Sequence, residues 1–356
     1  MLKTLALRGF RGFESYELTD LATVNLIVGK NNCGKTTVLE AVELLVSNGH
    51  PFVLHGVAGR RGEVTSSGSN VEISHLFFGH VCEPGVCFTL TADDGLRALS
   101  ARLLSLDDVG EDASLWTDRR GFSEEESDPA FGLHIASGAG GKTNVLPVAE
   151  DGTIPSSRWP RSIRNVASDA PVRFLTLESL ASERMRDAWD KVLAEGREDE
   201  IARDMEFLVP EIDSIHFLTG GRLRDGGVLV GRRGGGRRIP IGSYGDGLRR
   251  LLALRLALTG ANHGFLLIDE IDAGLHWTVM EDAWRLLVEV AKKSDVQIFA
   301  TTHSLDCIRG LGSLVRSRPD LGAEVSLQKV HPSLEQAVSF AGEQIATAVE
   351  QQIELR

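Results

Sequence analysis

The residues best suited to chemistry form a glycine-rich run near the start of the chain. Residues 29–36 read Gly-Lys-Asn-Asn-Cys-Gly-Lys-Thr and match G-x-x-x-x-G-K-[ST] at every fixed position. Glycines let the backbone turn tightly around a phosphate, and a following helix N-terminus favours an anion. Lys35 adds a positive charge for the β- and γ-phosphates, and the Thr36 hydroxyl suits Mg²⁺. The run predicts a nucleotide-binding loop, with contacts expected from Gly29, Asn31, Asn32, Cys33, Gly34, Lys35, Thr36 and Thr37.

The segments that must position this loop lie on either side of it. The apolar run 24–28 reads as a buried strand, and apolar residues at helical spacing follow the loop, at Val38, Leu39, Val42 and Leu45. The alternative is a chance glycine-rich turn, which would not need a strand before it and a helix after it.

A pair of acids follows a second apolar run. Residues 265–268 read Phe-Leu-Leu-Ile and lead into Asp269 and Glu270. Ligands bind at the carboxyl edge of an open α/β sheet, so this strand would deliver both acids to the phosphate loop. We expect Asp269 to support Mg²⁺ together with Thr36, and Glu270 to act as the catalytic base on the attacking water. A third buried run ends at His303, which could sense the γ-phosphate or be a structural histidine.

A second anion site is predicted where residues 243–247, Ser-Tyr-Gly-Asp-Gly, precede a long apolar helix. The free amides of a helix N-terminus and a serine hydroxyl can bind a phosphate. The phosphate loop already holds its own nucleotide, so this helix is best explained as facing a nucleotide held by another subunit.

Composition excludes several classes of protein. The chain has 356 residues, 42% of them hydrophobic, and a net charge of −12, which argues against a protein that coats nucleic acid. No apolar run approaches the roughly 20 residues of a membrane span, so we expect no membrane partner. Four cysteines without metal-ligand clustering are typical of a reduced, cytoplasmic compartment.

The remaining chain is less regular. We expect two short strands within residues 1–28, a β-rich lobe with mobile loops, helices over 172–208, strands over 212–241, a strand at 325–330 and a helix at 334–352. The tip of the 212–241 segment carries a basic patch. It either contacts nucleic acid or is a solvated hairpin tip, and it comprises Arg222, Arg224, Arg232, Arg233, Arg237 and Arg238.

Taken in this order, the motifs resemble the head of an ABC-type ATPase, the class that includes SMC-type and RecF-type ATPases. The opening Phe10-Arg-Gly-Phe13, the 243–247 loop, the segment Asp269 to His276 and the terminal Ile353-Glu-Leu-Arg356 look like its OLD-like, AAA branch. The resemblance implies a single α/β domain with a central mixed or parallel sheet, an antiparallel β lobe and a helical subdomain. Its expected parts are a nucleotide-binding core of residues 1–50 and 240–356, a lobe of residues 51–170, and a helical subdomain with the basic hairpin at 171–239.

The resemblance also implies function. ATP and Mg²⁺ would be bound and ATP hydrolysed in a homodimer that sandwiches two nucleotides. Ser243, Gly245 and Gly247 would contact ATP across the dimer, residues 272–276 would link the two sites, and His303 would be the switch histidine. By similarity to stand-alone members of this branch, we expect closure of the ATP-bound dimer to control a separately encoded effector. The effector would be a Toprim-like nuclease or a toxin, and the system would act in defence against phage. The alternative is a RecF-like DNA-binding ATPase of repair.

Two departures from the family pattern stand out. The class usually carries a glutamine between the phosphate loop and the 243–247 segment, whereas this chain has none before Gln297. His75, or a neighbour within residues 72–78, is the candidate replacement. The 53 residues after His303 are too few for a Toprim domain of typical size, so any nuclease activity is expected from a separate protein.

Overall fold

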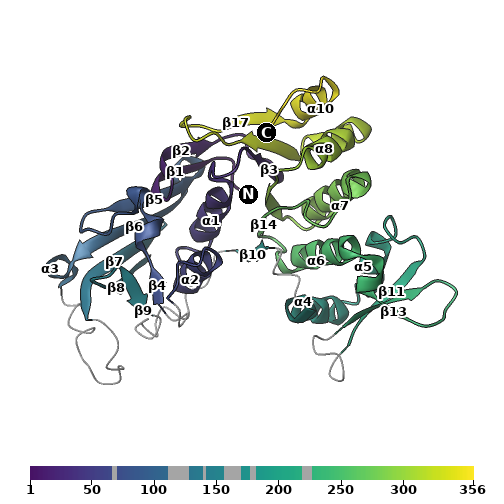
Figure 1. The fold of residues 1–356 in the computed structure, drawn as a ribbon, viewed down its shortest axis with the longest axis horizontal. Helices are drawn as coiled ribbons and strands as arrows, with labels where there is room; N and C mark the ends of the chain where they lie inside the picture. Colours follow the sequence, from purple (N-terminus) through teal and green to yellow (C-terminus); the bar gives the residue numbers. More distant parts are fainter. Residues whose placement is uncertain (66–69, 111–127, 139–141, 156–169, 177–181, 219–226) are drawn as a thin grey trace.

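The structure is a computed structural model of residues 1–356. It describes the chain except for residues 66–69, 111–127, 139–141, 156–169, 177–181 and 219–226 (Figure 1).

A six-stranded sheet forms the centre of the molecule. Its strand order is β10-β14-β15-β3-β16-β17, and every neighbouring pair is parallel except β16 and β17. The strands are β3 (Val24–Val28), β10 (Val172–Leu175), β14 (Phe265–Ile268), β15 (Gln297–Thr301), β16 (Val325–Lys329) and β17 (Val338–Ala341). Because β14, β15 and β3 are parallel neighbours, the segments that follow them emerge at one edge of the sheet.

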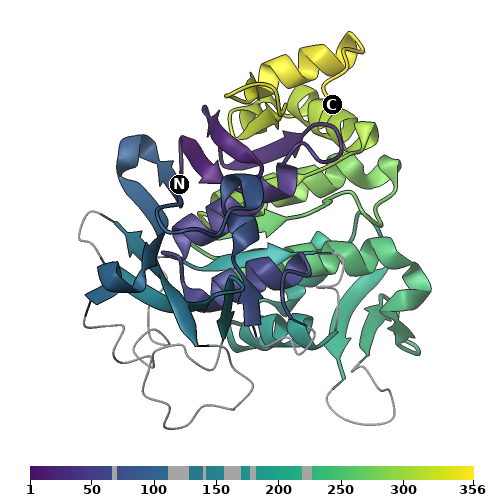
Figure 2. The ribbon, with the colours of Figure 1, turned by 60° about the vertical axis from the view of Figure 1, so that its left-hand side comes forward.

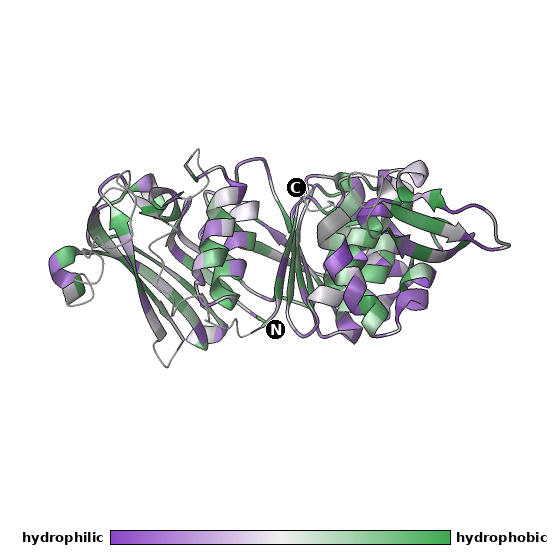
Figure 3. Cartoon of the chain, turned by 90° about the horizontal axis from the view of Figure 1, so that it is seen from below, coloured by the Kyte–Doolittle hydropathy of each residue, from purple (hydrophilic) through white to green (hydrophobic). Residues whose placement is uncertain are grey.

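The continuous apolar character of these strands reflects burial on both faces. In β3, Leu26 faces one hydrophobic core and Ile27 faces the other, and β14 alternates in the same way between Leu266 and Leu267. Figure 3 shows the central sheet nearly edge-on, with helices on each side of it. The sheet therefore divides two cores and holds the site-bearing strand ends rigidly.

The first core lies between the central sheet and an antiparallel sheet of order β2-β1-β5-β6-β7-β8. Its strands are β1 (Leu5–Phe10), β2 (Phe13–Leu18), β5 (Cys87–Ala92), β6 (Arg97–Ser105), β7 (Pro129–Ser137) and β8 (Lys142–Ala149), and the helices between the sheets are α1 (Lys35–Val46) and α2 (Pro51–Arg60). Strands β4 (Asn70–Glu72) and β9 (Thr153–Pro155) form a separate pair, and α3 (Leu106–Val109) follows β6. Strand β2, near the start of the chain, lies beside the segment that leads into β17, because Ala337 N donates to Glu17 O (Figure 2).

The second core is covered by helices α6 (Asp246–Gly260), α7 (Met280–Lys293), α8 (Leu305–Ser317) and α10 (Gly342–Glu350) (Figure 1). The short α9 (Pro319–Gly322) packs against α8. Helices α4 (Ser182–Ala194) and α5 (Glu198–Asp204) and a small sheet extend from α6. That sheet consists of β11 (Ile212–Phe217), β12 (Val228–Arg232) and β13 (Ile239–Pro240). The predicted fold class is confirmed: a central, mostly parallel sheet with an antiparallel β lobe and helices.

Two local predictions are wrong. Residues 172–175 were expected to be helical but form β10, because pairing with the buried β14 supplies hydrogen bonds that an isolated segment lacks. The helix expected at 334–352 is shorter, since residues 338–341 pair with β16 as β17 and the helix α10 starts only at Gly342. In both cases tertiary pairing overrides local propensity. Among the described residues, no helix combines the length and apolar character needed to cross a membrane.

An ion pair between a buried glutamate and a more exposed arginine joins α1 to α2. Arg60 forms an ion pair with Glu43, and its guanidinium carbon lies 3.8 Å from the ring centre of Phe174 in β10. Burial raises the pKa of Glu43 to about 7, while Arg60 opposes this rise. The folded protein therefore keeps the Glu43 proton at pH values where the unfolded chain, with an ordinary pKa of 4.5, has lost it.

This shift predicts a pH dependence of stability. Between pH 5 and pH 8 the unfolding free energy of wild type should fall relative to that of Glu43→Gln, by on the order of 1–3 kcal/mol. The reason is that only wild type has a carboxyl group at position 43, which binds its proton more tightly in the folded than in the unfolded state. Urea denaturation at several pH values measures the difference, with Glu350→Gln at the exposed end of α10 as control. Parallel profiles for wild type and Glu43→Gln would contradict the account.

Candidate functional site

The phosphate loop connects β3 directly to α1. Gly29 has φ 147° and Gly34 has φ 100°, which L side chains rarely adopt. A Cβ on Gly34 would lie 2.3 Å from the ring of Phe13, so only glycine fits there. The loop is thus shaped by backbone conformation and by close packing from β2, and its amides stand at the start of a 12-residue helix.

Lys35 is held inside this loop. Its Nζ donates to the carbonyl oxygens of Gly29 (2.9 Å) and Lys30 (2.8 Å), and the residue is only 6% exposed. Burial lowers the pKa of Lys35, although Cys33, Asp269 and Glu270 oppose this effect electrostatically. Besides these carbonyl oxygens, the Lys35 ammonium lies 4.0 Å from Cys33 Sγ. A buried cation with mainly neutral partners is well suited to an anion entering the loop.

The first acid of the predicted pair lies against the end of the loop. Thr36 Oγ1 is 3.3 Å from both carboxylate oxygens of Asp269, and Thr301 Oγ1 donates to Asp269 Oδ1 at 2.6 Å. The next residue, Glu270, has a left-handed backbone with φ 52° and donates its amide to Thr301 Oγ1. Its side chain is exposed. Two neighbouring strands, β14 and β15, thus fix the acids relative to α1.

These groups border one cavity of about 720 Å³. Of the predicted residues, it is lined by Asn31, Asn32, Cys33, Gly34, Lys35, Thr36, Thr37, Asp269, Glu270 and His303. Gly29 contributes to the site through the carbonyl that binds Lys35. The volume is in the range of ordinary small-ligand sites. Parts of the chain more than 230 residues apart in sequence therefore meet at the predicted edge of the sheet.

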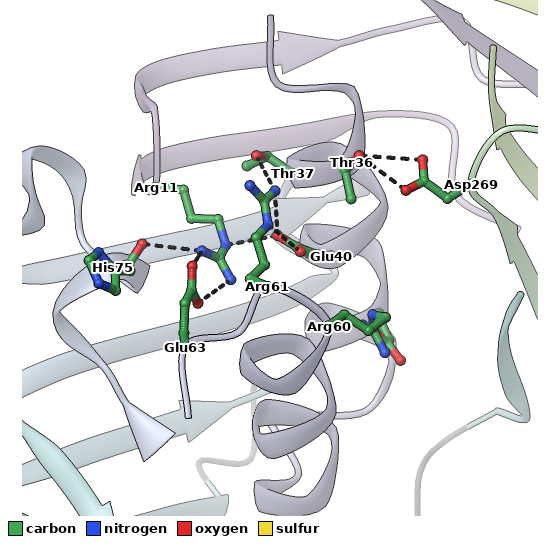
Figure 4. Close-up of polar contacts among 10 residues, drawn as sticks. Arg11, Thr36, Thr37, Glu40, Arg60, Arg61, Glu63, His75 and Asp269 are labelled. Atoms are coloured by element: carbon green, nitrogen blue, oxygen red, sulfur yellow. Dashed lines mark hydrogen bonds and ion pairs between the residues drawn. The ribbon is translucent and has the colours of Figure 1, made fainter. Parts of the chain in front are cut away.

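An ion network supports one wall of the cavity (Figure 4). The Glu40 carboxylate, 0% exposed, lies between Arg11 (Nε to Oε2, 2.7 Å) and Arg61 (Nε to Oε1, 2.8 Å). Arg61 also donates to Thr37 Oγ1 at 3.1 Å, and Arg11 donates twice to Glu63. Arg11 is buried and also lines the cavity.

Other residues that line the cavity were not predicted from the sequence. Arg61, Glu63, His80 and Pro332 border the cavity but belong to no recognisable local pattern. His75, the suggested replacement for the missing glutamine, also lines it, with Nδ1 3.0 Å from His80 Nδ1. Its role stays a prediction.

The carboxyl end of β10 also lies at this edge of the sheet. Leu175 O accepts from Asp269 N at 3.0 Å, so the chain leaves β10 beside the acid pair. Residues 177–181, which follow, lie outside the described part of the chain.

The 243–247 segment lies apart from the cavity. Ser243 and Gly245 are exposed, and neither they nor Gly247 line it. Gly245, with φ 87° and ψ 174°, starts α6 in a conformation nearly restricted to glycine. A Cβ on Gly247 would lie 3.3 Å from Gly274 O, so this segment packs against the loop that follows Glu270.

Helix α6 is tied to the acid pair by a buried arginine. Arg250, 0% exposed, donates to the carbonyl oxygens of Asp269 (3.3 Å), Glu270 (3.1 Å) and Thr176 (3.3 Å). Burial lowers its pKa, against the opposing charges of Asp272, Glu270 and Asp269. Arg250 therefore holds the helix that follows the 243–247 segment against the backbone of the acid pair.

The predicted basic patch is partly neutralised. Arg232 lies 4.0 Å from Glu211, and Arg233 forms an ion pair with Glu206. Arg237 and Arg238 are exposed beside the glycines at the tip. Arg222 and Arg224 lie outside the described residues.

The donor atoms near Thr36 fit a hard cation. Thr36 and Asp269 offer oxygen ligands, the type that Mg²⁺ prefers, and Mg²⁺ usually takes its remaining ligands from phosphate and water. No group of three or more His, Cys, Asp or Glu side chains suited to a metal occurs in the described ranges. The residues present thus fit an ion that arrives with a nucleotide.

Comparisons with known proteins agree with this geometry. The family model described as "AAA ATPase domain" matches residues 1–90, and the one described as "AAA domain, putative AbiEii toxin, Type IV TA system" matches residues 189–309. An ATP/GTP phosphatase of Helicobacter pylori is 22% identical over 89% of both chains. The DNA replication and repair protein RecF of Xanthomonas axonopodis pv. citri is 27% identical over 59% of this chain and 57% of its own.

Solved SMC heads also align with the chain. An SMC head bound to the C-winged helix domain of ScpA covers 96% of this chain and 98% of its own, with 16% identity and a TM-score of 0.49. The SMC head domain from Thermotoga maritima has the same coverage, 15% identity and a TM-score of 0.43. The AAA models match the segments that carry the phosphate loop and the acid pair. The phosphate loop, the acid pair and His303 meet at one edge of the sheet. The chain is therefore similar to AAA ATPase domains in the two segments that carry the phosphate loop and the acid pair.

Proposed function

We propose that this chain binds ATP with Mg²⁺ and hydrolyses it in a homodimer whose two active sites are each completed by the partner subunit. One observation carries the proposal. The cavity holds the phosphate loop, the acids and His303, whereas Ser243 and Gly245 are exposed on a separate loop at the start of α6. A helix N-terminus that presents free amides outward can serve a phosphate held by another molecule.

The residues of the cavity divide the chemistry between them. Lys35 and the loop amides neutralise the phosphates, and Thr36 with Asp269 would hold Mg²⁺, which supplies charge stabilisation when bound. Glu270 is exposed at the cavity and accepts a proton from the attacking water. His303, from the neighbouring strand end, contacts the γ-phosphate. The H. pylori relative named as an ATP/GTP phosphatase supports this type of reaction.

The output of the cycle is movement. ATP binding closes the dimer, hydrolysis opens it, and we propose that this motion controls a separately encoded effector, a Toprim-like nuclease or toxin, in defence against phage. Support comes from the OLD-like motifs of the sequence. The family model matched by residues 189–309, whose description names a toxin of a toxin–antitoxin system, supports it as well.

A DNA-binding ATPase of repair is the second candidate, and the likeness to RecF favours it. The pairing of Arg232 and Arg233 with acids weakens the basic patch that this function would use.

The two candidates differ in their response to DNA. If a protein partner governs the cycle, the steady-state ATPase rate should change less than about twofold on adding duplex DNA at low salt, where phosphate contacts are strongest. Strong stimulation, lost in Arg237→Ala/Arg238→Ala, would instead establish the repair-like function. Lys35→Ala provides the blank for contaminating ATPase.

Lys35→Ala should abolish ATP binding, because the loop loses the buried cation that faces the phosphates. Titration with a fluorescent ATP analogue measures this, and Lys30→Ala, which removes an exposed lysine from the same loop, should bind within about threefold of wild type. Wild-type affinity in Lys35→Ala would refute the assignment of the loop.

Ser243→Arg should leave ATP binding intact but reduce turnover by at least about 100-fold, since a bulky cation at the start of α6 blocks the phosphate of the partner subunit. Ser243→Ala, which keeps a small side chain, should lose much less. The steady-state rate and the nucleotide affinity are compared for both variants. Unchanged turnover in Ser243→Arg would show that this loop takes no part in the reaction.

A further inference from the structure

Three consecutive residues at the end of β15 each serve a different part of the site. The Thr301 hydroxyl contacts Asp269 and the Glu270 amide, the Thr302 hydroxyl contacts the Asp272 carboxylate, and His303 lines the cavity. Thr301 thus belongs to the acid pair. Thr302 instead contacts the loop that follows the acid pair. No residue of that loop is among the described residues that line the cavity.

The hydrogen-bond direction at Thr302 is fixed by its surroundings. Its Oγ1 accepts from Ser304 N at 2.9 Å, so its single hydroxyl proton is available for Asp272 Oδ1. Thr302 is 0% exposed, so water cannot readily replace this bond. A hydrogen bond to a charged acceptor in a buried position is among the stronger polar contacts in proteins.

Asp272 lies near the start of the loop between Glu270 and Trp277. The loop starts after Glu270, passes Gly274 beside the 243–247 segment and ends at Trp277, which is 63% exposed. The loop is otherwise anchored to β15 by Ile271 N, which donates to Thr301 O at 3.0 Å. Thr302 directly precedes His303 in the sequence, so its side chain joins the start of this loop to the segment that carries His303.

We propose that Thr302 is a positioning residue that makes the Asp272 loop and the His303 segment move as one body. The proposal rests on the proposed function, in which His303 contacts the γ-phosphate and the loop faces the partner subunit. A shift of His303 on nucleotide binding or hydrolysis is then transmitted through the Thr302 hydroxyl to Asp272 and from there to the surface that includes the 243–247 segment.

A purely structural hydroxyl would behave differently. It would stabilise the fold, and its loss would lower the melting temperature without separating catalytic rate from nucleotide affinity. A positioning hydroxyl acts on turnover while ATP binding, which depends on Lys35 and the loop amides, is retained. Its effect should also be restored by any side chain that supplies a hydroxyl at the same place.

The test compares two substitutions in the full chain. Thr302→Val keeps the shape and removes the hydroxyl, and should lower kcat by about 10- to 100-fold with KM for ATP within about twofold of wild type. Thr302→Ser keeps the hydroxyl and should stay within about threefold in kcat. Thr347→Val, which removes a hydroxyl bonded to Glu343 O on the exposed α10, is the matched control. Wild-type kcat in Thr302→Val, or an equal loss in Thr302→Ser, would overturn the proposal.

A double-mutant cycle keeps the test decisive if Thr302→Val folds poorly. Asp272→Ala removes the acceptor and should show the same loss of kcat with retained KM; wild-type turnover would overturn the proposal. Where both single variants fold, the double variant should be no slower than Asp272→Ala alone, and additive losses would contradict the link. Failure of the proposed function is distinguishable, because it would appear as an inactive wild type or as a fully active Ser243→Arg variant.

Discussion

The contact between Thr36 and Asp269 is the constraint on which the site depends. The hydroxyl lies 3.3 Å from both carboxylate oxygens, although the residues are 233 positions apart. It exists because β15 lies between β3 and β14 in a parallel sheet, so that three strand ends reach one edge. The two hydrophobic cores on either side of these strands keep the edge rigid, and a shift of one strand would separate the phosphate loop from the acids.

Buried charges extend this rigidity away from the cavity. Glu40 binds two arginines beneath the phosphate loop, and Arg250 joins α6 to the backbone of Asp269 and Glu270. Arg255, five residues further along α6 and also fully buried, is paired with Asp204 and Glu200 of α5. A buried ion pair contributes little net stability, but removing one partner is costly. These networks therefore fix the relative positions of helices more than they strengthen the fold.

Much of the site could be predicted because its signals are local. The phosphate loop needs glycines and a lysine at fixed spacing, and strand ends are marked by apolar runs that stop at polar residues. The misses have a common cause, since they depend on contacts between distant segments. Strand β10 forms only because β14 lies beside it, and Arg61 and Glu63 reach the cavity through a network that no short pattern encodes. The exposed position of the 243–247 segment could be inferred, but its packing against Gly274 could not.

The central claim is that each active site is shared between two subunits. The most direct test is the molar mass of Glu270→Gln, which should bind ATP and hydrolyse it slowly, measured by light scattering over a range of protein concentrations. We predict a dimer with ATP and Mg²⁺, a monomer with ADP, and a monomer under both conditions when Ser243→Arg is added. A mass that stays monomeric with ATP at saturating nucleotide and high protein concentration would contradict the shared site.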